Sequence, residues 1–220
     1  MRHERKFLVG ENFKNLIKNF LLENKFTNCY PSRLVNSIYY DSFCFRRYHE
    51  SEDGISDRSK CRIRFYNSDI KHLNLEYKSK FAELGSKHIE SLQDNKFKTK
   101  EFEHVLIIKN AGNNVCKLMI PKAINNFDHP SLFVSYKRDY YVSLDNKIRL
   151  TIDSNLNFGK MRNGNLIKNY IQNINYNFGV LEVKYDFNQE DLDIVETLAS
   201  TNSLNLTRFS KYCLGVKSCY

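Results

Sequence analysis

The sequence predicts a mainly β (α+β) fold, an antiparallel sheet or barrel with a few flanking helices. Tyr and Phe are abundant, with 14 and 16 copies, and aromatic residues favour strands. Most segments alternate polar and apolar residues with the period of two that is typical of a strand. The polar positions of these segments mostly carry Lys, Arg or a carboxylate, which suggests charges that converge on a lumen.

The elements follow one another in a simple order. A strand is predicted over residues 3–9, and a helix over 11–24, where apolar residues recur at i, i+3 and i+4. Further strands are predicted at 35–42, 59–67, 72–80, 132–142, 146–153 and 179–187. A last helix is predicted over 189–200, where an acidic first turn suits the helix dipole. The polar stretches 81–100 and 157–177 are expected to be irregular, and 101–127 fits either helix or strand.

The charges of each predicted strand occupy one face, because side chains alternate across a strand. These faces carry Glu4 and Lys6; Lys60, Arg62 and Arg64; Glu76, Lys78 and Lys80; Lys147, Arg149 and Asp153; and Glu182, Lys184 and Asp186. For any single strand, a solvated face is the simpler interpretation. Repetition over several strands favours a confined site, where gathered cations repel one another unless they bind an anion. Arginine and lysine match phosphate oxygens, and carboxylates beside them would hold a hard divalent metal.

Length and composition indicate one globular domain over residues 1–220. The net charge of 34 − 25 = +9 points to an anionic partner. The six cysteines form no C-x-x-C pair, so we expect reduced thiols rather than a structural zinc site. No signal peptide is visible, and no apolar run reaches the roughly 18 residues that span a bilayer. We therefore expect a cytoplasmic protein that is at most peripheral to a membrane.

Several short motifs, in order along almost the whole chain, carry a resemblance to a known family. They are Arg2-His-Glu-Arg-Lys-Phe7, Ser37-Ile-Tyr-Tyr-Asp41, Arg58-Ser-Lys-Cys-Arg-Ile-Arg-Phe-Tyr66, Leu75-Glu-Tyr-Lys78 with Lys87, Tyr136-Lys-Arg138, Arg149-Leu-Thr-Ile-Asp153, Leu181-Glu-Val-Lys184, and Phe209-Ser-Lys-Tyr212 with Gly215. With them the chain resembles the catalytic domain of the vacuolar transporter chaperone (VTC) polyphosphate polymerases, part of the triphosphate tunnel metalloenzyme, or CYTH-like, superfamily. The resemblance implies an antiparallel β-barrel around a charged tunnel, the triphosphate tunnel fold.

The resemblance also implies roles for individual residues. Phosphates of the nucleotide or of a growing chain would be bound by Lys6, Arg62, Arg64, Lys78, Lys87, Arg138, Arg149, Lys184, Arg208 and Lys211, with Tyr136 steadying them through a hydrogen bond. The catalytic candidates among these are Lys211, Arg208, Lys184 and Arg138. Glu182 would be the principal ligand of a Mn²⁺ or Mg²⁺ ion and Glu4 a second ligand, with Glu76 and Asp153 as weaker candidates.

Two positions depart from the pattern of the superfamily. Arg2 stands where the first Glu of a Glu-x-Glu-x-Lys motif is expected, so only Glu4 and Lys6 remain. This loss favours the polymerase branch over the hydrolytic branches. Arg208 stands where the family often has Lys, and the two cations differ in hydrogen-bond geometry.

The function that this resemblance implies is a polyphosphate polymerase, which transfers the γ-phosphate of ATP onto inorganic polyphosphate and releases ADP. A triphosphatase or nucleotide phosphatase of the same fold and a non-catalytic polyphosphate-binding module are the alternatives. Nucleic acid is not an expected partner, because no RNP, zinc-finger or helix-turn-helix pattern occurs. A separate membrane protein that receives the product is a further conceivable partner.

Overall fold

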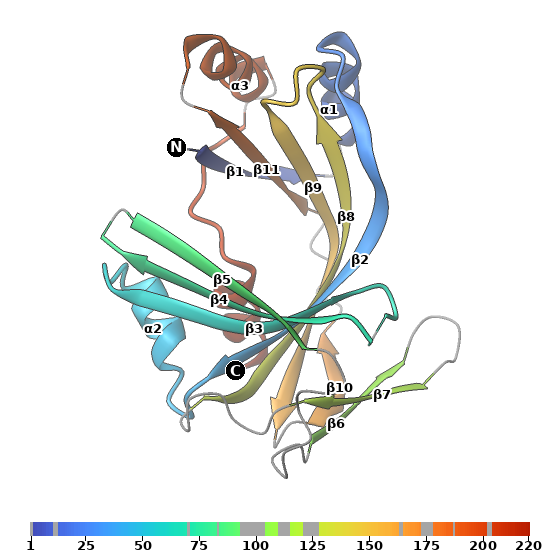
Figure 1. Ribbon diagram of the computed structural model, residues 1–220, viewed down its shortest axis with the longest axis vertical. Coiled ribbons are helices and arrows are strands. Elements are labelled where there is room, and N and C mark those ends of the chain that lie inside the picture. The colour runs from blue at the N-terminus through green and yellow to red at the C-terminus, as the bar shows by residue number, and fades with distance from the viewer. Residues whose placement is uncertain are drawn as a thin grey trace. The chain divides into compact units, whose positions relative to one another are not determined.

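The computed structural model describes residues 2–10, 13–69, 71–82, 84–92, 104–109, 115–120, 128–162, 165–172, 178–186, 188–201 and 204–220. Within these residues the fold is mainly β, with eleven strands and four helices (Figure 1). The strands are β1 (Arg2–Gly10), β2 (Thr27–Asp41), β3 (Arg58–Tyr66), β4 (Leu73–Phe81), β5 (Leu84–Leu92), β6 (His104–Lys109), β7 (Val115–Ile120), β8 (His129–Val142), β9 (Arg149–Arg162), β10 (Asn165–Gln172) and β11 (Phe178–Asp186). The predicted mainly β class is confirmed.

The main sheet has the strand order β1-β11-β9-β8-β2-β3-β4-β5, with β10 paired to β9, while β6 and β7 form a separate hairpin. The pairs β1–β11, β11–β9, β2–β3, β3–β4 and β4–β5 are all antiparallel, as expected. Among the described residues this order has two ends, β1 and β5, so the sheet is not closed there into the expected barrel.

The chain divides into two compact units, each built from three segments. Unit 1 comprises residues 1–34, 136–156 and 175–209, and unit 2 comprises 35–135, 157–174 and 210–220. The long strands β2, β8 and β9 contribute residues to both units. The single domain expected over residues 1–220 stays a prediction.

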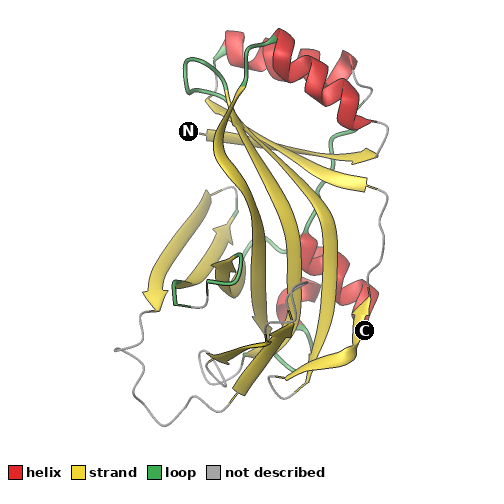
Figure 2. Ribbon diagram, turned by 90° about the vertical axis from the view of Figure 1, so that its right-hand side faces the viewer, coloured by secondary structure: helices red, strands yellow, loops and turns green. Residues whose placement is uncertain are grey.

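Unit 1 has its core between the strands and two helices, α1 (Phe13–Glu23) and α3 (Gln189–Thr201). Both helices are drawn at the same end of these strands (Figure 2). Phe20 of α1 and Val195 of α3 join the buried cluster that contains Phe7 of β1 and Val183 of β11. The apolar alternation of the strands and the i, i+3, i+4 stripe of α1 therefore bury the same core, which leaves the opposite strand face to the charged residues.

Unit 2 packs β2, β3 and β4 around a second core that includes Ile38, Ile63 and Phe133. Its helices are α2 (Arg46–Glu52) and α4 (Lys211–Cys219). The carboxylate of Asp41 joins them, because it accepts hydrogen bonds from the backbone N–H of Arg47 at 3.0 Å and from the Tyr212 hydroxyl. No helix within the described residues combines the length and the apolar character needed to cross a membrane.

Three parts of the prediction differ from the structure. Residues 81–100 include strand β5, and the loop expected at 157–177 includes the end of β9 and strand β10. β5 lies at the end of the sheet order and is exposed over eight of its nine residues, so it has no buried face to impose alternation. The ambiguous segment 101–127 contains strands β6 and β7, and its other residues, like 93–103, lie outside the described part.

Candidate functional site

On the polar face of its strands, unit 1 carries lysine and glutamate side chains at neighbouring positions. Lys6 of β1 lies directly opposite Glu182 of β11, and Glu4 lies opposite Lys184. Lys184 Nζ is 2.9 Å from Glu182 Oε1 and 3.7 Å from Glu4 Oε2, and Lys6 Nζ is 2.8 Å from Glu4 Oε1. Strand alternation and antiparallel register are therefore sufficient to bring two carboxylates and two ammonium groups into one cluster.

Arg138 of β8 extends this cluster. Its Nε and Nη2 donate to the two carboxylate oxygens of Asp153 at 2.5 and 2.7 Å, and Nη2 lies 4.0 Å from Glu182 Oε2. The Asp153 side chain is fully buried, and its hydrogen bonds hold the pKa of Arg138 above the usual value, although burial lowers it. Tyr136 is also buried, and the Arg138 guanidinium carbon lies 5.3 Å from its ring centre. Asp153 and Tyr136 thus fix the orientation of Arg138.

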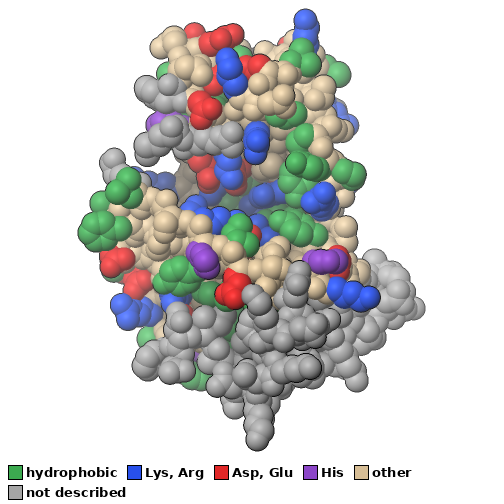
Figure 3. Space-filling model, viewed as in Figure 1, with side chains coloured by type: hydrophobic (Ala, Val, Ile, Leu, Met, Phe, Trp, Pro, Cys, Tyr) green, Lys and Arg blue, Asp and Glu red, His purple; other side chains and the backbone are tan. Residues whose placement is uncertain are grey.

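Glu182 is the ionised centre of the cluster. Burial raises its pKa, but the charges of Lys184, Lys6 and Arg138 outweigh this effect and hold the pKa well below its usual range. Figure 3 shows such a mixture of acidic and basic side chains on the visible face. A carboxylate that stays ionised although only 11% of its side chain is exposed is suited to a cation or to cationic side chains.

The residues of this cluster fit a divalent metal that arrives with a phosphate ligand. Glu182 and Glu4 supply two hard oxygen donors, and Mg²⁺ in proteins is commonly held by one or two carboxylates, water and substrate phosphates. Thr151 lies opposite Glu182 on β9, and its hydroxyl is a buried polar atom that has no hydrogen-bond partner among the residues that the structure describes. No group of three His, Cys, Asp or Glu side chains in the described part of the chain could hold a metal alone.

Unit 2 carries a second cluster, which is centred on Glu76 of β4. Arg62 donates to Glu76 Oε2 from Nε at 2.7 Å, Lys87 donates to Oε1 at 3.0 Å, and Arg64 Nη1 lies 3.7 Å away. Arg62 also donates to the Tyr39 hydroxyl at 2.8 Å. Three cations share one carboxylate, so this cluster has an excess of positive charge.

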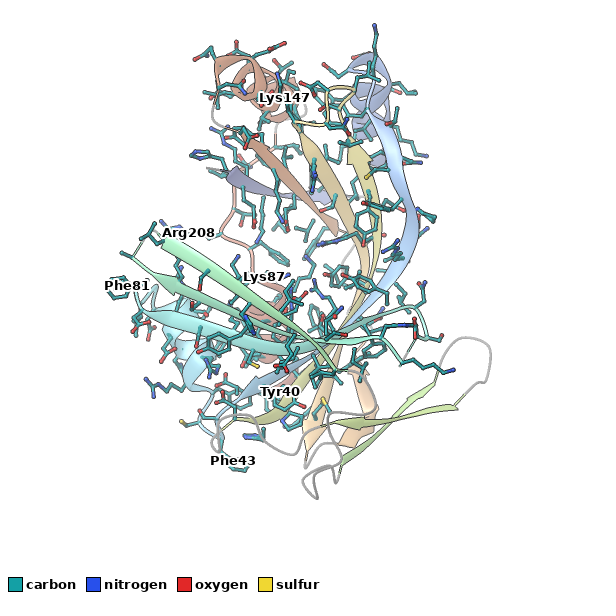
Figure 4. The ribbon with its side chains drawn as sticks, in the orientation of Figure 1. Tyr40, Phe43, Phe81, Lys87, Lys147 and Arg208 are labelled. Carbon is teal, nitrogen blue, oxygen red and sulfur yellow. The ribbon has the colours of Figure 1, made fainter. Side chains whose placement is uncertain are left out.

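A row of three lysines lies beside the Glu76 cluster. Lys60 of β3 is directly opposite Lys78 of β4, which is directly opposite Lys87 of β5. Lys87 is labelled in Figure 4. Directly opposed like charges destabilise a sheet. Lys60 Nζ donates to Ser210 Oγ at 2.9 Å. Ser210 caps α4, whose first residue is Lys211, so Lys60, at one end of the row, contacts the residue that precedes the predicted catalytic lysine.

Glu76 makes the stability of the protein depend on pH in the acid range. Burial raises its pKa, but Arg62, Arg64 and Lys87 lower it from the usual 4.5 to about 2. Because the folded pKa is depressed, the carboxylate contributes at most about 3 kcal/mol above pH 4.5, and this is lost as pH falls towards 2. We expect urea denaturation at several pH values to show a steeper loss between pH 5 and 2 for the wild type than for Glu76→Gln. Parallel pH profiles for the two proteins would contradict the coupling.

Two further predicted residues, Arg149 and Arg208, lie on or beside the strands of unit 1. Arg149 is exposed and lies opposite Lys184. Arg208 is exposed and follows Thr207, whose backbone N–H donates to the Lys6 carbonyl at 2.9 Å. The predicted site residues thus divide between the two units. Unit 1 contains Lys6, Arg138, Arg149, Lys184, Arg208 and Tyr136, with the carboxylates of Glu4, Asp153 and Glu182. Unit 2 contains Arg62, Arg64, Lys78, Lys87 and Lys211, with the carboxylate of Glu76.

Three residues of these clusters were not among the predicted site residues. Lys60 shares the Arg62 face and could have been included by alternation alone. Tyr39 stacks on Tyr212 with ring centres 4.9 Å apart, and it lies in the motif Ser37-Ile-Tyr-Tyr-Asp41, which assigned it no role. That the Thr151 hydroxyl has no hydrogen-bond partner among the described residues follows only from the three-dimensional positions of its neighbours.

Comparison of the chain with known proteins identifies its family. The family model described as the VTC domain matches residues 1–220. The chain belongs to the VTC domain family. The resemblance carried by the sequence motifs is thereby confirmed. No curated protein matches this VTC domain.

Solved structures with the same fold come from distant organisms. A putative adenylate cyclase from Bacillus halodurans is 16% identical, with 94% of this chain and 92% of that chain covered and a TM-score of 0.52. One from Vibrio parahaemolyticus is 11% identical, with 97% of each chain covered and a TM-score of 0.53. A putative adenylyl cyclase from Hippeastrum, described as having a dominant triphosphatase activity, is 12% identical, with 100% and 97% covered and a TM-score of 0.52. At these identities the similarity shows the fold alone.

Proposed function

We propose that this VTC domain is a polyphosphate polymerase that transfers the γ-phosphate of ATP onto a growing polyphosphate chain and releases ADP. The observation that carries the proposal is the row of Lys60, Lys78 and Lys87, which stand directly opposite one another across three strands. Directly opposed like charges destabilise a sheet, and Glu76 neutralises only part of this positive charge, so a bound polyanion would reduce the cost. The VTC family match supports the same substrate class.

The two clusters suit different parts of this chemistry. The unit 1 cluster combines Lys6, Lys184 and Arg138 with Glu4 and Glu182, so it can hold a nucleotide triphosphate together with a metal. The unit 2 cluster has one carboxylate for several cations, which suits a bare phosphate chain. We assign the metal-bound triphosphate to unit 1 and phosphates of the polymer to unit 2.

Phosphoryl transfer requires positioning and charge neutralisation more than covalent chemistry. Asp153 orients Arg138, whereas Lys184 and Lys6 contact the carboxylates of Glu182 and Glu4. These three cations would bind the oxygens of the transferring group. The acceptor is a phosphate that is already ionised near neutral pH, so no strong general base is needed. Arg208 would add positive charge to the unit 1 cluster, and Lys211 would add it to the unit 2 cluster.

Glu182 and Glu4 would hold the divalent ion. When bound, such an ion polarises phosphoryl oxygens and neutralises charge as the reaction proceeds. Mn²⁺ and Mg²⁺ both prefer the oxygen donors that these two carboxylates and the phosphates supply.

The test is to incubate the purified protein with ATP and Mn²⁺ or Mg²⁺, with and without a short polyphosphate primer, and to separate the products on a gel stained for polyphosphate. We expect a ladder of chains together with ADP in proportion. The triple variant Lys60→Gln, Lys78→Gln, Lys87→Gln should shorten or abolish the ladder. ATP or polyphosphate binding without any ladder would overturn the polymerase assignment.

A triphosphatase is the second candidate, favoured by the dominant triphosphatase activity described for the Hippeastrum protein of the same fold. Water would then replace the phosphate acceptor. Free phosphate released from inorganic tripolyphosphate or ATP, without a ladder at any primer concentration, would support this function. The Arg at position 2, in place of a carboxylate, favours the polymerase.

A further inference from the structure

Unit 1 contains a surface hollow that the proposed phosphate site does not use. It has a volume of about 260 Å³ and lies between the first residues of β2 and the last residues of β8. Its lining residues are Asn28, Cys29, Tyr30, Pro31, Ser32, Asp139, Tyr140 and Tyr141. The hollow is open and combines tyrosine rings with amide, hydroxyl and carboxylate groups.

Tyr30 and Tyr140 pack against each other, and this pair is called the aromatic corner below. The ring centres of Tyr30 and Tyr140 are 5.7 Å apart with an angle of 80° between the rings. The guanidinium carbon of Arg33 lies 5.2 Å from the Tyr30 ring centre and 5.9 Å from that of Tyr140. Tyr30 nevertheless keeps 56% of its surface exposed, so flat aromatic surface remains available to a ligand.

Tyr140 connects this corner to the phosphate cluster. It lies two residues after Arg138 on β8, and residues i and i+2 of a strand share a face at a separation of about 7 Å. A ligand whose phosphates are bound by Arg138 would therefore extend its next group towards Tyr140.

We propose that the hollow is the subsite for the base of the nucleoside triphosphate, with Tyr30, Tyr140 and Arg33 as its stacking surface. Nucleobases stack on aromatic rings and on guanidinium planes. Asn28, which lies two residues before Tyr30 on β2, can accept a hydrogen bond from the exocyclic amino group of adenine through its side-chain oxygen. This inference rests on the proposed function, because it takes ATP as the phosphate donor.

The subsite predicts that a stacking variant loses affinity for ATP and keeps its affinity for the same phosphates without a base. Calorimetric titration with ATP and with inorganic tripolyphosphate, each with Mg²⁺, compares the two ligands. For Tyr30→Leu and Tyr140→Leu we expect ATP to bind about 5- to 100-fold more weakly, with tripolyphosphate changed less than twofold. Tyr30→Phe keeps the ring and should bind ATP like the wild type.

The outcomes separate this inference from the proposed function. Equal weakening of both ligands, or no weakening of either, overturns the base subsite, whether or not the wild type forms a polyphosphate ladder. Selective loss of ATP affinity supports the subsite even if the wild type only hydrolyses ATP. Thermal melting of each variant identifies a folding defect, and the exposed position of Tyr30 makes its variant the decisive one if Tyr140→Leu unfolds.

Discussion

The variant Glu182→Gln is expected to lower metal-dependent ATP turnover by about 100-fold or more. Glu182 is the carboxylate that Lys184, Lys6 and Arg138 keep ionised, and it is the principal candidate for the metal. A metal at a transferring phosphoryl group contributes several kcal/mol of charge stabilisation, and each 1.36 kcal/mol corresponds to a factor of ten in rate. A neutral amide keeps the shape of the side chain and removes the charge that attracts the ion.

The same variant distinguishes a metal ligand from a residue that only orients cations. In metal-free solution Glu182→Gln should bind tripolyphosphate at least as tightly as the wild type, because one negative charge has gone from beside Lys6, Lys184 and Arg138. Added Mn²⁺ should strengthen tripolyphosphate binding to the wild type but not to the variant, as measured by calorimetry. If both proteins respond equally to Mn²⁺, Glu182 does not hold the metal.

A matched control for this experiment is Glu190→Gln. Glu190 lies in the same unit, in the acidic first turn of α3, and its side chain is exposed. The substitution makes the same chemical change away from the cluster, so turnover and the Mn²⁺ response should stay at wild-type values. A loss as large as that of Glu182→Gln would point to a general effect of net charge.

Strand alternation allowed the charged faces to be predicted from the sequence. Lys6 with Glu4, and Glu182 with Lys184, were assigned to shared faces because the period of two is a property of any extended chain. The structure adds the register, which sets Lys6 opposite Glu182. Register depends on hydrogen bonds between segments far apart in the sequence, and no local pattern reports it.

Lys87 shows where local patterns carry no information. It lies in a polar stretch that reads as a loop, yet it belongs to strand β5 and donates to Glu76 at 3.0 Å. An exposed strand at the end of a sheet buries neither face, so the sequence has no alternation to detect. Only the family resemblance indicated Lys87, and the role of the residue in phosphate binding stays a prediction.

Asp153 and Glu76 illustrate a second limit of the sequence. The family resemblance implied both as weaker metal candidates. In the structure each is engaged by arginine, Asp153 by Arg138 and Glu76 by Arg62. These carboxylates therefore orient arginines that are proposed to bind phosphate, whereas the closest cations to Glu182 and Glu4 are lysines, which are more adaptable partners.

The variant Asp153→Asn is expected to lower the free energy of unfolding by about 3–5 kcal/mol. Asp153 is fully buried and accepts two hydrogen bonds from Arg138, of which only 15% of the side chain is exposed. Removing one partner of a buried ion pair leaves an uncompensated charge. The asparagine amide would also direct its own N–H groups at those of the guanidinium. Such a loss is a large part of the about 5–15 kcal/mol that stabilises a typical protein.

Urea denaturation followed by circular dichroism measures this loss, and Asp145→Asn is its control. Asp145 pairs with Lys147 at 3.4 Å in the turn between β8 and β9 of the same unit, where both side chains are about half exposed (Figure 4). Exposed ion pairs contribute little, so Asp145→Asn should unfold at nearly the urea concentration of the wild type. If Asp153→Asn behaves like Asp145→Asn, the buried pair does not hold the strands together.

A double variant separates the structural role of the pair from its role in binding. Replacing a buried ion pair by apolar residues of similar volume is often neutral or stabilising, so Arg138→Met with Asp153→Leu should regain most of the stability that Asp153→Asn loses. The same double variant removes the guanidinium that is proposed to bind phosphate, and tripolyphosphate binding should therefore fall although the protein is stable. Recovery of stability together with wild-type binding would show that Arg138 is needed only for the fold, and the phosphate site would then depend on Lys6 and Lys184.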